Sequence, residues 1–243
     1  MAARRCLIVN ADDFGQSPGV NQGIIQAMER GIVTSASLMV RWPAAEAAAN
    51  YAREHPHLSI GLHVDLGEWA YREGEWMPVY SVVAKSDAAA VAEEVSRQLD
   101  RFCSLVGRSP THLDSHQHVH RGEPARSILI QVGRTLGVPL RHFSPIQYSG
   151  GFYGQTASGL PYPEGVSLER LIQTISSLPE GITELGCHPG LGDDVDSMYR
   201  AERAEELKSL CNPHIRKCMA TENIELISFH EFSRQTPVTP TSD

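Results

Sequence analysis

The chain has 243 residues, of which 41% are hydrophobic and 21% charged, with a formal net charge of −8 at pH 7. This composition is ordinary for a globular protein with its own core, and the acidic balance argues against a general nucleic-acid surface, which would be basic. No apolar run reaches the roughly 18 residues of a membrane span. The five cysteines lack CxxC spacing, so we expect reduced thiols and a cytoplasmic location.

Short apolar runs alternate with helix-like segments along the chain. We expect strands at 6–10, 34–40, 58–65, 111–116, 139–143, 182–187 and 224–229. The first helix should begin at Ser17 and Pro18, a good N-cap and first helical residue, and end at Gly31. Further helices are expected at 44–55, 88–107, 123–136, 167–178, 198–211 and 213–221. A loop to residue 86 and a Gly-, Tyr- and Pro-rich segment at 144–165 interrupt the alternation.

About seven strands alternating with helices predict an α/β fold of parallel β/α units. A distorted (β/α) barrel related to the TIM barrel is favoured over an open doubly wound sheet. No linker, composition break or repeat divides the sequence. We therefore expect a single domain over residues 1–235 and a disordered tail over 236–243.

Aspartates and histidines gather where these strands end. A lone Asp pair is more often a helix cap, and a lone strand histidine is more often part of the core. However, the carboxyl ends of the strands share one rim in β/α folds, so four separate segments should meet there. The residues are Asp12, Asp13, His63, Asp65, His112, Asp114, His116 and His188.

One carboxylate and two imidazoles can hold a divalent ion and leave positions open for water and substrate. The ion would activate the water, a second carboxylate would take its proton, and a further histidine would protonate a leaving group. Neighbouring side chains of an extended segment point in opposite directions. The pair Asp12 and Asp13 therefore suits a division between proton transfer and ion binding.

Five motifs resemble the YdjC-like carbohydrate deacetylases, a family that includes chitooligosaccharide deacetylase and a relative associated with hopanoid biosynthesis. They are "LIVNADDFG", "GIVTSASLMV", "IGLHVDL", "PTHLDSHQHVH" and "ELGCHPG", and they cover most of residues 6–230 in the family's order. The resemblance implies a distorted β/α barrel. It also implies hydrolytic removal of N-acetyl groups from amino sugars or short chitooligosaccharide-type substrates, with attack by a metal-bound water and a homodimeric assembly.

The resemblance assigns roles residue by residue. Asp13, His63 and His116 match the metal ligands, Asp12 the general base, and His188 the general acid. Gln117 departs from the pattern, because relatives often carry histidine there, but its side chain should point away from the ligands. The segment 144–165 matches too poorly to transfer substrate contacts.

Several alternatives stay open at this point. Two imidazoles favour Zn²⁺, Mn²⁺, Co²⁺ or iron over Mg²⁺, whereas the resemblance suggests Mg²⁺. A carbohydrate-binding protein without catalysis and a mononuclear iron oxygenase are the rival functions, and the substrate is either a free oligosaccharide or a glycolipid. Arg200 and Arg203 lie either on a solvated helix face or near the substrate. Loop aromatics form either a sugar groove or loop anchors: Trp69, Tyr71, Trp76, Tyr80, Tyr148, Phe152, Tyr153 and Tyr162.

Overall fold

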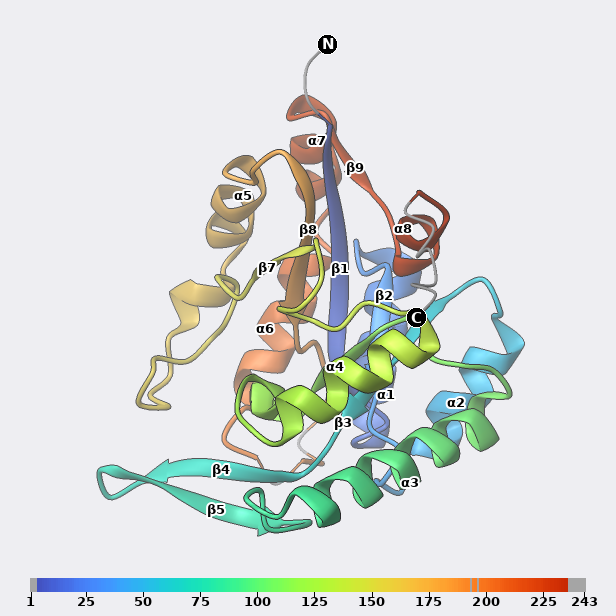
Figure 1. Cartoon of the computed structure of the whole chain (residues 1–243). Coiled ribbons are helices and arrows are strands. Elements are labelled where there is room, and N and C mark those ends of the chain that lie inside the picture. Colours follow the sequence, from blue (N-terminus) through green and yellow to red (C-terminus); the bar gives the residue numbers. More distant parts are fainter. Residues whose placement is uncertain (1–3, 193, 196, 236–243) are drawn as a thin grey trace.

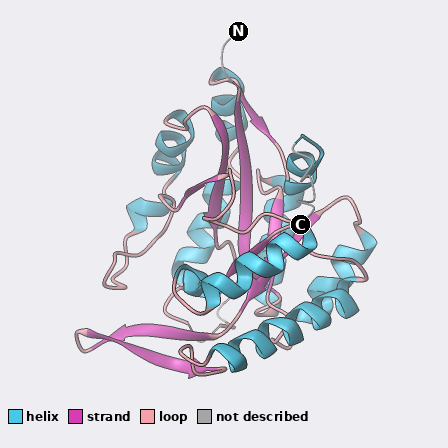
Figure 2. Cartoon of the chain, in the orientation of Figure 1, coloured by secondary structure: helices cyan, strands magenta, loops and turns pink. Residues whose placement is uncertain are grey.

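The computed structural model describes residues 4–192, 194–195 and 197–235, so the tail expected at 236–243 lies outside the described residues. A parallel sheet forms a half-barrel with helices around it (Figures 1 and 2). Its strands are β1 (Arg5–Phe14), β2 (Ser35–Leu38), β3 (Ser59–Val64), β6 (Leu113–Ser115), β7 (Gln147–Ser149), β8 (Gly181–Cys187) and β9 (Ile224–Leu226). The α/β fold class expected from the alternation is confirmed.

The strand order is β6-β3-β2-β1-β8-β7, with β9 also paired to β1, and every pairing in this sheet is parallel. The connecting helices are α1 (Pro18–Arg30), α2 (Ala45–Glu54), α3 (Ala88–Val106), α4 (Ala125–Leu136), α5 (Leu168–Ser176), α6 (Ala201–Leu210), α7 (Pro213–Thr221) and α8 (Phe229–Gln235). Within the described residues, none of these helices combines the length and apolarity needed to cross a membrane.

Helix α1 begins as its sequence predicts. The Ser17 hydroxyl accepts a hydrogen bond from the Val20 N–H, Pro18 occupies the first turn, and Gly31 ends the helix. An N-cap serine satisfies one of the backbone N–H groups that a helix start leaves without a partner. Three residues thus separate the end of β1, which carries the paired aspartates, from the start of the helix.

Strand β1 packs different clusters on its two faces. Leu7, Val9 and Ala11 belong to the large core shared with the helices, whereas Cys6 and Ile8 pack with a smaller group that includes residues of α8. Alternation along a strand produces this division. It stops at Asp13, whose φ of 66° is left-handed, and the pairing of β1 with β2 shifts register between Ala11 and Phe14.

The expected strand at 139–143 is wrong. Only Leu140 forms a single parallel bridge, to Leu113, and the next strand is β7 at Gln147–Ser149, which pairs with β8 instead. The chain thus passes from the β6 edge to the β8 edge between residues 141 and 146. This crossing brings Arg141 into the interior of the half-barrel, where it is 3% exposed.

The expected loop after the third strand is also wrong. It contains an antiparallel hairpin, β4 (Gly67–Arg72) and β5 (Glu75–Ser81), which pairs with no strand of the main sheet. The hairpin lies near the carboxyl end of β3 (Figure 1). Its outer strand is mostly exposed, so it lacks the alternating burial that identifies a strand in sequence.

Candidate active site

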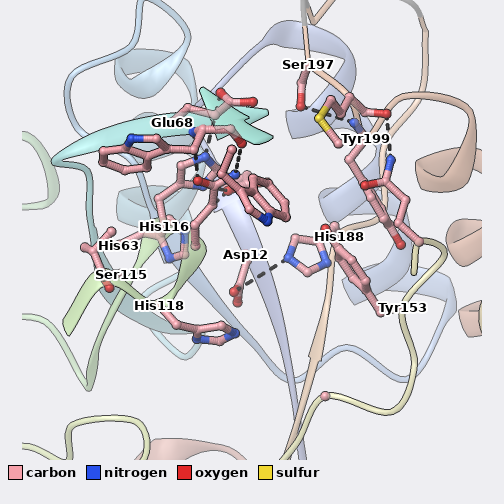
Figure 3. Close-up of a pocket in the computed structure, with 18 of the residues that line it drawn as sticks. Asp12, His63, Glu68, Ser115, His116, His118, Tyr153, His188, Ser197 and Tyr199 are labelled. Atoms are coloured by element: carbon pink, nitrogen blue, oxygen red, sulfur yellow. Dashed lines mark hydrogen bonds and ion pairs between the residues drawn. The ribbon is translucent and has the colours of Figure 1, made fainter. Parts of the chain in front are cut away.

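A cavity of about 750 Å³ opens at the carboxyl ends of the strands. All five site residues expected from the sequence line it: Asp12, Asp13, His63, His116 and His188. Figure 3 shows Asp12, His63, His116 and His188 at this cavity. They come from the ends of β1, β3, β6 and β8. The parallel sheet therefore brings these residues to one rim, as the alternation of strands and helices predicts.

Both neighbouring aspartates face this cavity, although adjacent residues of a regular strand would point apart. The left-handed backbone of Asp13 explains this, because it ends the alternation at that residue. Such a conformation is uncommon for residues other than glycine and is concentrated at functional sites. The expectation of opposed side chains was therefore wrong, and the pair enters the cavity together.

Asp13, His63 and His116 converge at the floor of the cavity, and all three are buried. Asp13 Oδ1 lies 3.3 Å from His63 Nε2 and 3.1 Å from His116 Nδ1. The Nε2 atoms of both histidines are buried without a hydrogen-bond partner. A carboxylate and two imidazoles with unsatisfied buried nitrogens form a donor set that fits a divalent ion.

Each of the three candidate ligands is oriented by a second residue or by another ligand. His63 Nδ1 lies 2.8 Å from Asp114 Oδ1, which directs Nε2 toward Asp13. Arg203 donates to the second oxygen of Asp13 at 2.7 Å. Carboxylate partners of this kind fix the tautomer and ring orientation of metal-binding histidines.

The protonation states of Asp13, His63 and His116 depend on the charges around them. Burial lowers the pKa of His116, but hydrogen bonding and charge attraction from Asp13 reverse that effect and raise the pKa to about 9. Burial also lowers the pKa of His63, and Asp114 reverses it, so that the pKa lies well above its usual range. For Asp13, burial raises the pKa, but Arg203 and His116 hold it well below its ordinary value.

Asp12 is held beside this group by Arg141. Two guanidinium nitrogens of Arg141 donate to the two oxygens of Asp12, each at 2.7 Å. Asn10 donates to Asp12 Oδ1 at 2.9 Å. Burial raises the pKa of Asp12, but the charge and the hydrogen bonds of Arg141, together with the charge of His63, outweigh this effect and the pKa falls below its ordinary value. Asp12 is therefore an ionised carboxylate in a fixed orientation.

His188 lies across the cavity from the group formed by Asp13, His63 and His116. Its Nε2 is 3.8 Å from Asp12 Oδ2 (Figure 3). Its Nδ1 is 3.7 Å from Glu206 Oε1, and its backbone N–H donates to Glu206. The Tyr199 hydroxyl donates to the same carboxylate. Glu206 therefore fixes the segment that presents His188 to Asp12.

Other chemically capable side chains nearby are engaged elsewhere. The thiol of Cys187 donates to Asn10 O at 3.3 Å, and burial raises the pKa of this thiol well above its usual range. It is therefore a poor nucleophile. His112 stacks on Phe229 at a ring distance of 3.7 Å, and Asp65 binds Arg41 and other residues outside the cavity.

A second group of imidazoles, His118, His120 and His142, is also close enough to surround an ion. However, both ring nitrogens of His120 are engaged, one with Ser115 Oγ and the other with Arg141 O. The Arg141 guanidinium also lowers the pKa of His118 and His120, after the larger effect of burial. A cation is therefore better accommodated by the Asp13 group.

Several residues of the site were missed by sequence reasoning. Arg141 lies inside a predicted strand, where a lone charge among apolar residues was the available signal. Glu68 lies 3.7 Å from His116 Nε2, but it sits in the hairpin that the sequence did not indicate. Arg203 and Glu206 occupy one face of α6, so the open question about Arg203 is decided in favour of the site. Glu184 on β8 binds Arg141 and was also missed.

The loop aromatics divide between the two interpretations left open. Four line the cavity: Trp69, Trp76, Tyr148 and Tyr153. The others support structure, because Phe152 is in the core, Tyr80 donates to Asp65, and Tyr162 accepts from Arg170. Tyr71 packs edge-on against Trp76, with ring centroids 5.7 Å apart.

Curated relatives match the chain along almost its whole length. It is 35% identical to a carbohydrate deacetylase of Geobacillus stearothermophilus over 250 residues, which covers 94% of this chain and 98% of the relative. It is 32% identical to a chitooligosaccharide deacetylase of Serratia marcescens, with 93% and 99% covered.

Solved structures share the fold. A putative cellobiose-phosphate cleavage protein from Enterococcus faecalis aligns with a TM-score of 0.78 and 25% identity over 95% of this chain and 99% of its own. A family 4 carbohydrate esterase from Streptomyces lividans, in complex with acetate, aligns with a TM-score of 0.57 and 13% identity over 94% and 96%. The family model described as YdjC-like protein matches residues 6–221. The chain therefore belongs to the YdjC-like protein family.

Proposed function

We propose that this chain is a carbohydrate deacetylase that hydrolyses the N-acetyl group of an amino sugar in a short oligosaccharide. The named activities of its relatives support this class of reaction. The observation that carries the proposal is the position of Asp12, an ionised carboxylate that faces His188 Nε2 at 3.8 Å beside the Asp13 group. A base and an acid next to each other in one cavity suit the hydrolysis of an amide.

Asp13, His63 and His116 would hold a divalent ion. Bound there, such an ion would polarise the acetyl carbonyl and stabilise negative charge on its oxygen. Two imidazoles and one carboxylate suit Zn²⁺, Mn²⁺ or Co²⁺ better than Mg²⁺. Arg203 and Asp114 keep Asp13 and His63 in the orientation that the ion needs.

The chain's own groups then move the protons. Asp12 accepts a proton from the attacking water as the new C–O bond forms, and Arg141 keeps this carboxylate ionised beforehand. His188 Nε2 donates a proton to the sugar nitrogen as the C–N bond breaks, which leaves acetate and a free amine. Because Asp12 Oδ2 and His188 Nε2 lie 3.8 Å apart, the proton held by Asp12 has a short path back to the imidazole.

The experiment measures acetate release from N-acetylglucosamine, N,N′-diacetylchitobiose and a glycolipid-linked N-acetylglucosamine. Wild type, Asp12→Asn and the exposed control Asp100→Asn are compared, each with added Zn²⁺, Mn²⁺, Co²⁺ or Mg²⁺ and with a chelator. Bound metal is measured separately. We expect acetate from wild type and the control, and normal metal content without turnover in Asp12→Asn.

The same assay separates the rival functions. A carbohydrate-binding protein would bind the sugars and release no acetate in any form. An oxygenase would consume oxygen, and the parallel half-barrel differs from the antiparallel scaffold common to that class. Acetate release that persists undiminished in Asp12→Asn would contradict the role given to this carboxylate. The homodimer and the cytoplasmic location stay predictions.

A further inference from the structure

The β4–β5 hairpin forms one wall of the cavity without belonging to the main sheet. Glu68, Trp69 and Trp76 of the hairpin all line the cavity. Trp76 is 52% exposed, although tryptophan is among the most costly side chains to leave in water. A large aromatic surface is therefore available at the mouth of the site.

A bulge directs two consecutive hairpin residues toward the cavity. The pairing of β4 with β5 shifts register between Glu68 and Trp69. Bulges let neighbouring residues leave strict alternation, and they recur beside active sites. The residue opposite Trp69 is Pro78, which has no backbone N–H to donate. The carbonyl of Trp69 therefore needs a hydrogen-bond donor from elsewhere.

Gln117 is that donor. Its Nε2 donates to Trp69 O at 2.8 Å, and its Oε1 accepts from the Trp69 N–H at 2.9 Å. The side-chain amide of Gln117 thus makes the two hydrogen bonds that the backbone of a third strand would make to Trp69. Gln117 directly follows His116 and has a left-handed φ of 49°, so the hairpin is attached one residue away from the candidate metal ligand.

Trp69 and Trp76 differ in what covers them. The Lys85 ammonium lies 3.4 Å from the centre of the Trp69 ring, a cation–π contact that holds this indole in place. Trp76 meets Tyr71 in a T-shaped contact with an interplanar angle of 69°. Among the described residues, no aromatic ring stacks flat against Trp76. Its position suits the flat, apolar C–H face of a pyranose ring.

We propose that Trp76 binds the sugar unit next to the one that loses its acetyl group, and that Gln117 is the positioning residue that holds the hairpin in place for it. This inference rests on the proposed function. The reacting acetyl group must lie within reach of both Asp12 and His188, whereas Trp76 belongs to a separate hairpin at the cavity wall. A monosaccharide would use only the inner part, and a disaccharide would also contact the hairpin.

The test compares kcat and KM for N-acetylglucosamine and N,N′-diacetylchitobiose in wild type, Trp76→Ala and Gln117→Ala. Met77→Ala is the matched control, because Met77 is 48% exposed on the same strand and does not line the cavity. We expect wild type to prefer the disaccharide. Both variants should reduce that preference about tenfold through KM, a loss equivalent to about 1.4 kcal/mol, with metal content unchanged.

Hydrogen exchange separates positioning from direct contact. Gln117→Ala should increase backbone exchange across residues 67–81, whereas Trp76→Ala should change KM without this increase. Equal losses for mono- and disaccharide, or a wild type without preference for the disaccharide, would overturn the inference.

A chain that is not a deacetylase would give a different result, and the subsite can still be tested by binding. If wild type releases no acetate, calorimetric titration of Asp12→Asn with the same two sugars still tests the subsite. Tighter binding of the disaccharide that is lost in Asp12→Asn/Trp76→Ala supports the subsite without deacetylation. Equal binding of the two sugars, or no binding of either, overturns it.

Discussion

Arg141 binds both oxygens of Asp12 and, through the same guanidinium group, reaches Asp114 at 2.7 Å and Glu184 at 2.6 Å. Asp114 in turn lies 2.8 Å from His63 Nδ1. One buried cation therefore orients the candidate base and, through Asp114, a candidate metal ligand. A change at this guanidinium would therefore affect both the residue proposed to transfer protons and a residue proposed to bind the ion.

Arg141→Lys should disable the base while leaving most of the fold intact. A lysine ammonium carries the charge but cannot hold two carboxylate oxygens in a fixed plane. We expect kcat to fall roughly 10²-fold because the base is misplaced. The pKa of Asp12 should rise toward its ordinary value, so the acidic limb of the pH–rate profile should move to higher pH.

Steady-state kinetics from pH 4 to 9 check this prediction, with the exposed Arg126→Lys as control. A variant with reduced kcat and an unmoved acidic limb would mean that Arg141 positions Asp12 without setting its charge.

Metal binding should release protons. Without an ion, Asp13 raises the pKa of His116 to about 9 against the opposing effect of burial, so this imidazole carries a proton at neutral pH. A bound cation must displace that proton, and metal affinity should therefore weaken as pH falls below 9. Titration calorimetry at pH 7.5 in two buffers of different ionisation enthalpy measures the released protons. Identical heats in both buffers would contradict the prediction.

The sequence was sufficient to predict that the five candidate residues lie together, because its signals are local and repeat. Apolar runs alternating with helices predicted parallel strands, and Asp12, Asp13, His63, His116 and His188 fall at the ends of those runs. Parallel topology then places them on one rim. No knowledge of long-range contacts was needed for that step.

The residues that sequence reasoning missed depend on irregular backbone. Arg141 enters the site because the chain leaves the β6 edge after one bridge at Leu140 and crosses to β8. Glu68 and Trp69 enter through a bulge, and Asp13 through a left-handed φ. Periodicity describes regular strands and helices, so it carries no information about these departures.

Glu184→Gln should change how stability depends on pH. Burial raises the pKa of Glu184, Arg141 opposes this, and the outcome is about 7 against an ordinary 4.5. Between these values the folded protein holds a proton that the unfolded chain has lost. Wild-type stability should therefore fall as pH rises from 4.5 to 7, by up to about 3 kcal/mol, and level off above that.

Glutamine has no proton to lose, so the variant should lack this decline. Urea unfolding at pH 5 and pH 8 measures it, with the exposed Glu180→Gln as control. The prediction fails if the difference in unfolding free energy between wild type and Glu184→Gln is the same at both pH values.

Gly61→Ala should destabilise the sheet through His112. A Cβ at Gly61 would lie 2.5 Å from the imidazole of His112, which is itself stacked on Phe229 at 3.7 Å. The ring cannot move away without breaking that stack, so overpacking should cost about 1–3 kcal/mol. Urea unfolding checks the loss, with Gly151→Ala as control, since a Cβ there meets only Ser149 Oγ at 3.9 Å. Because β3 carries His63 two residues later, metal affinity should fall with stability. A variant as stable as wild type would show that His112 has room to repack.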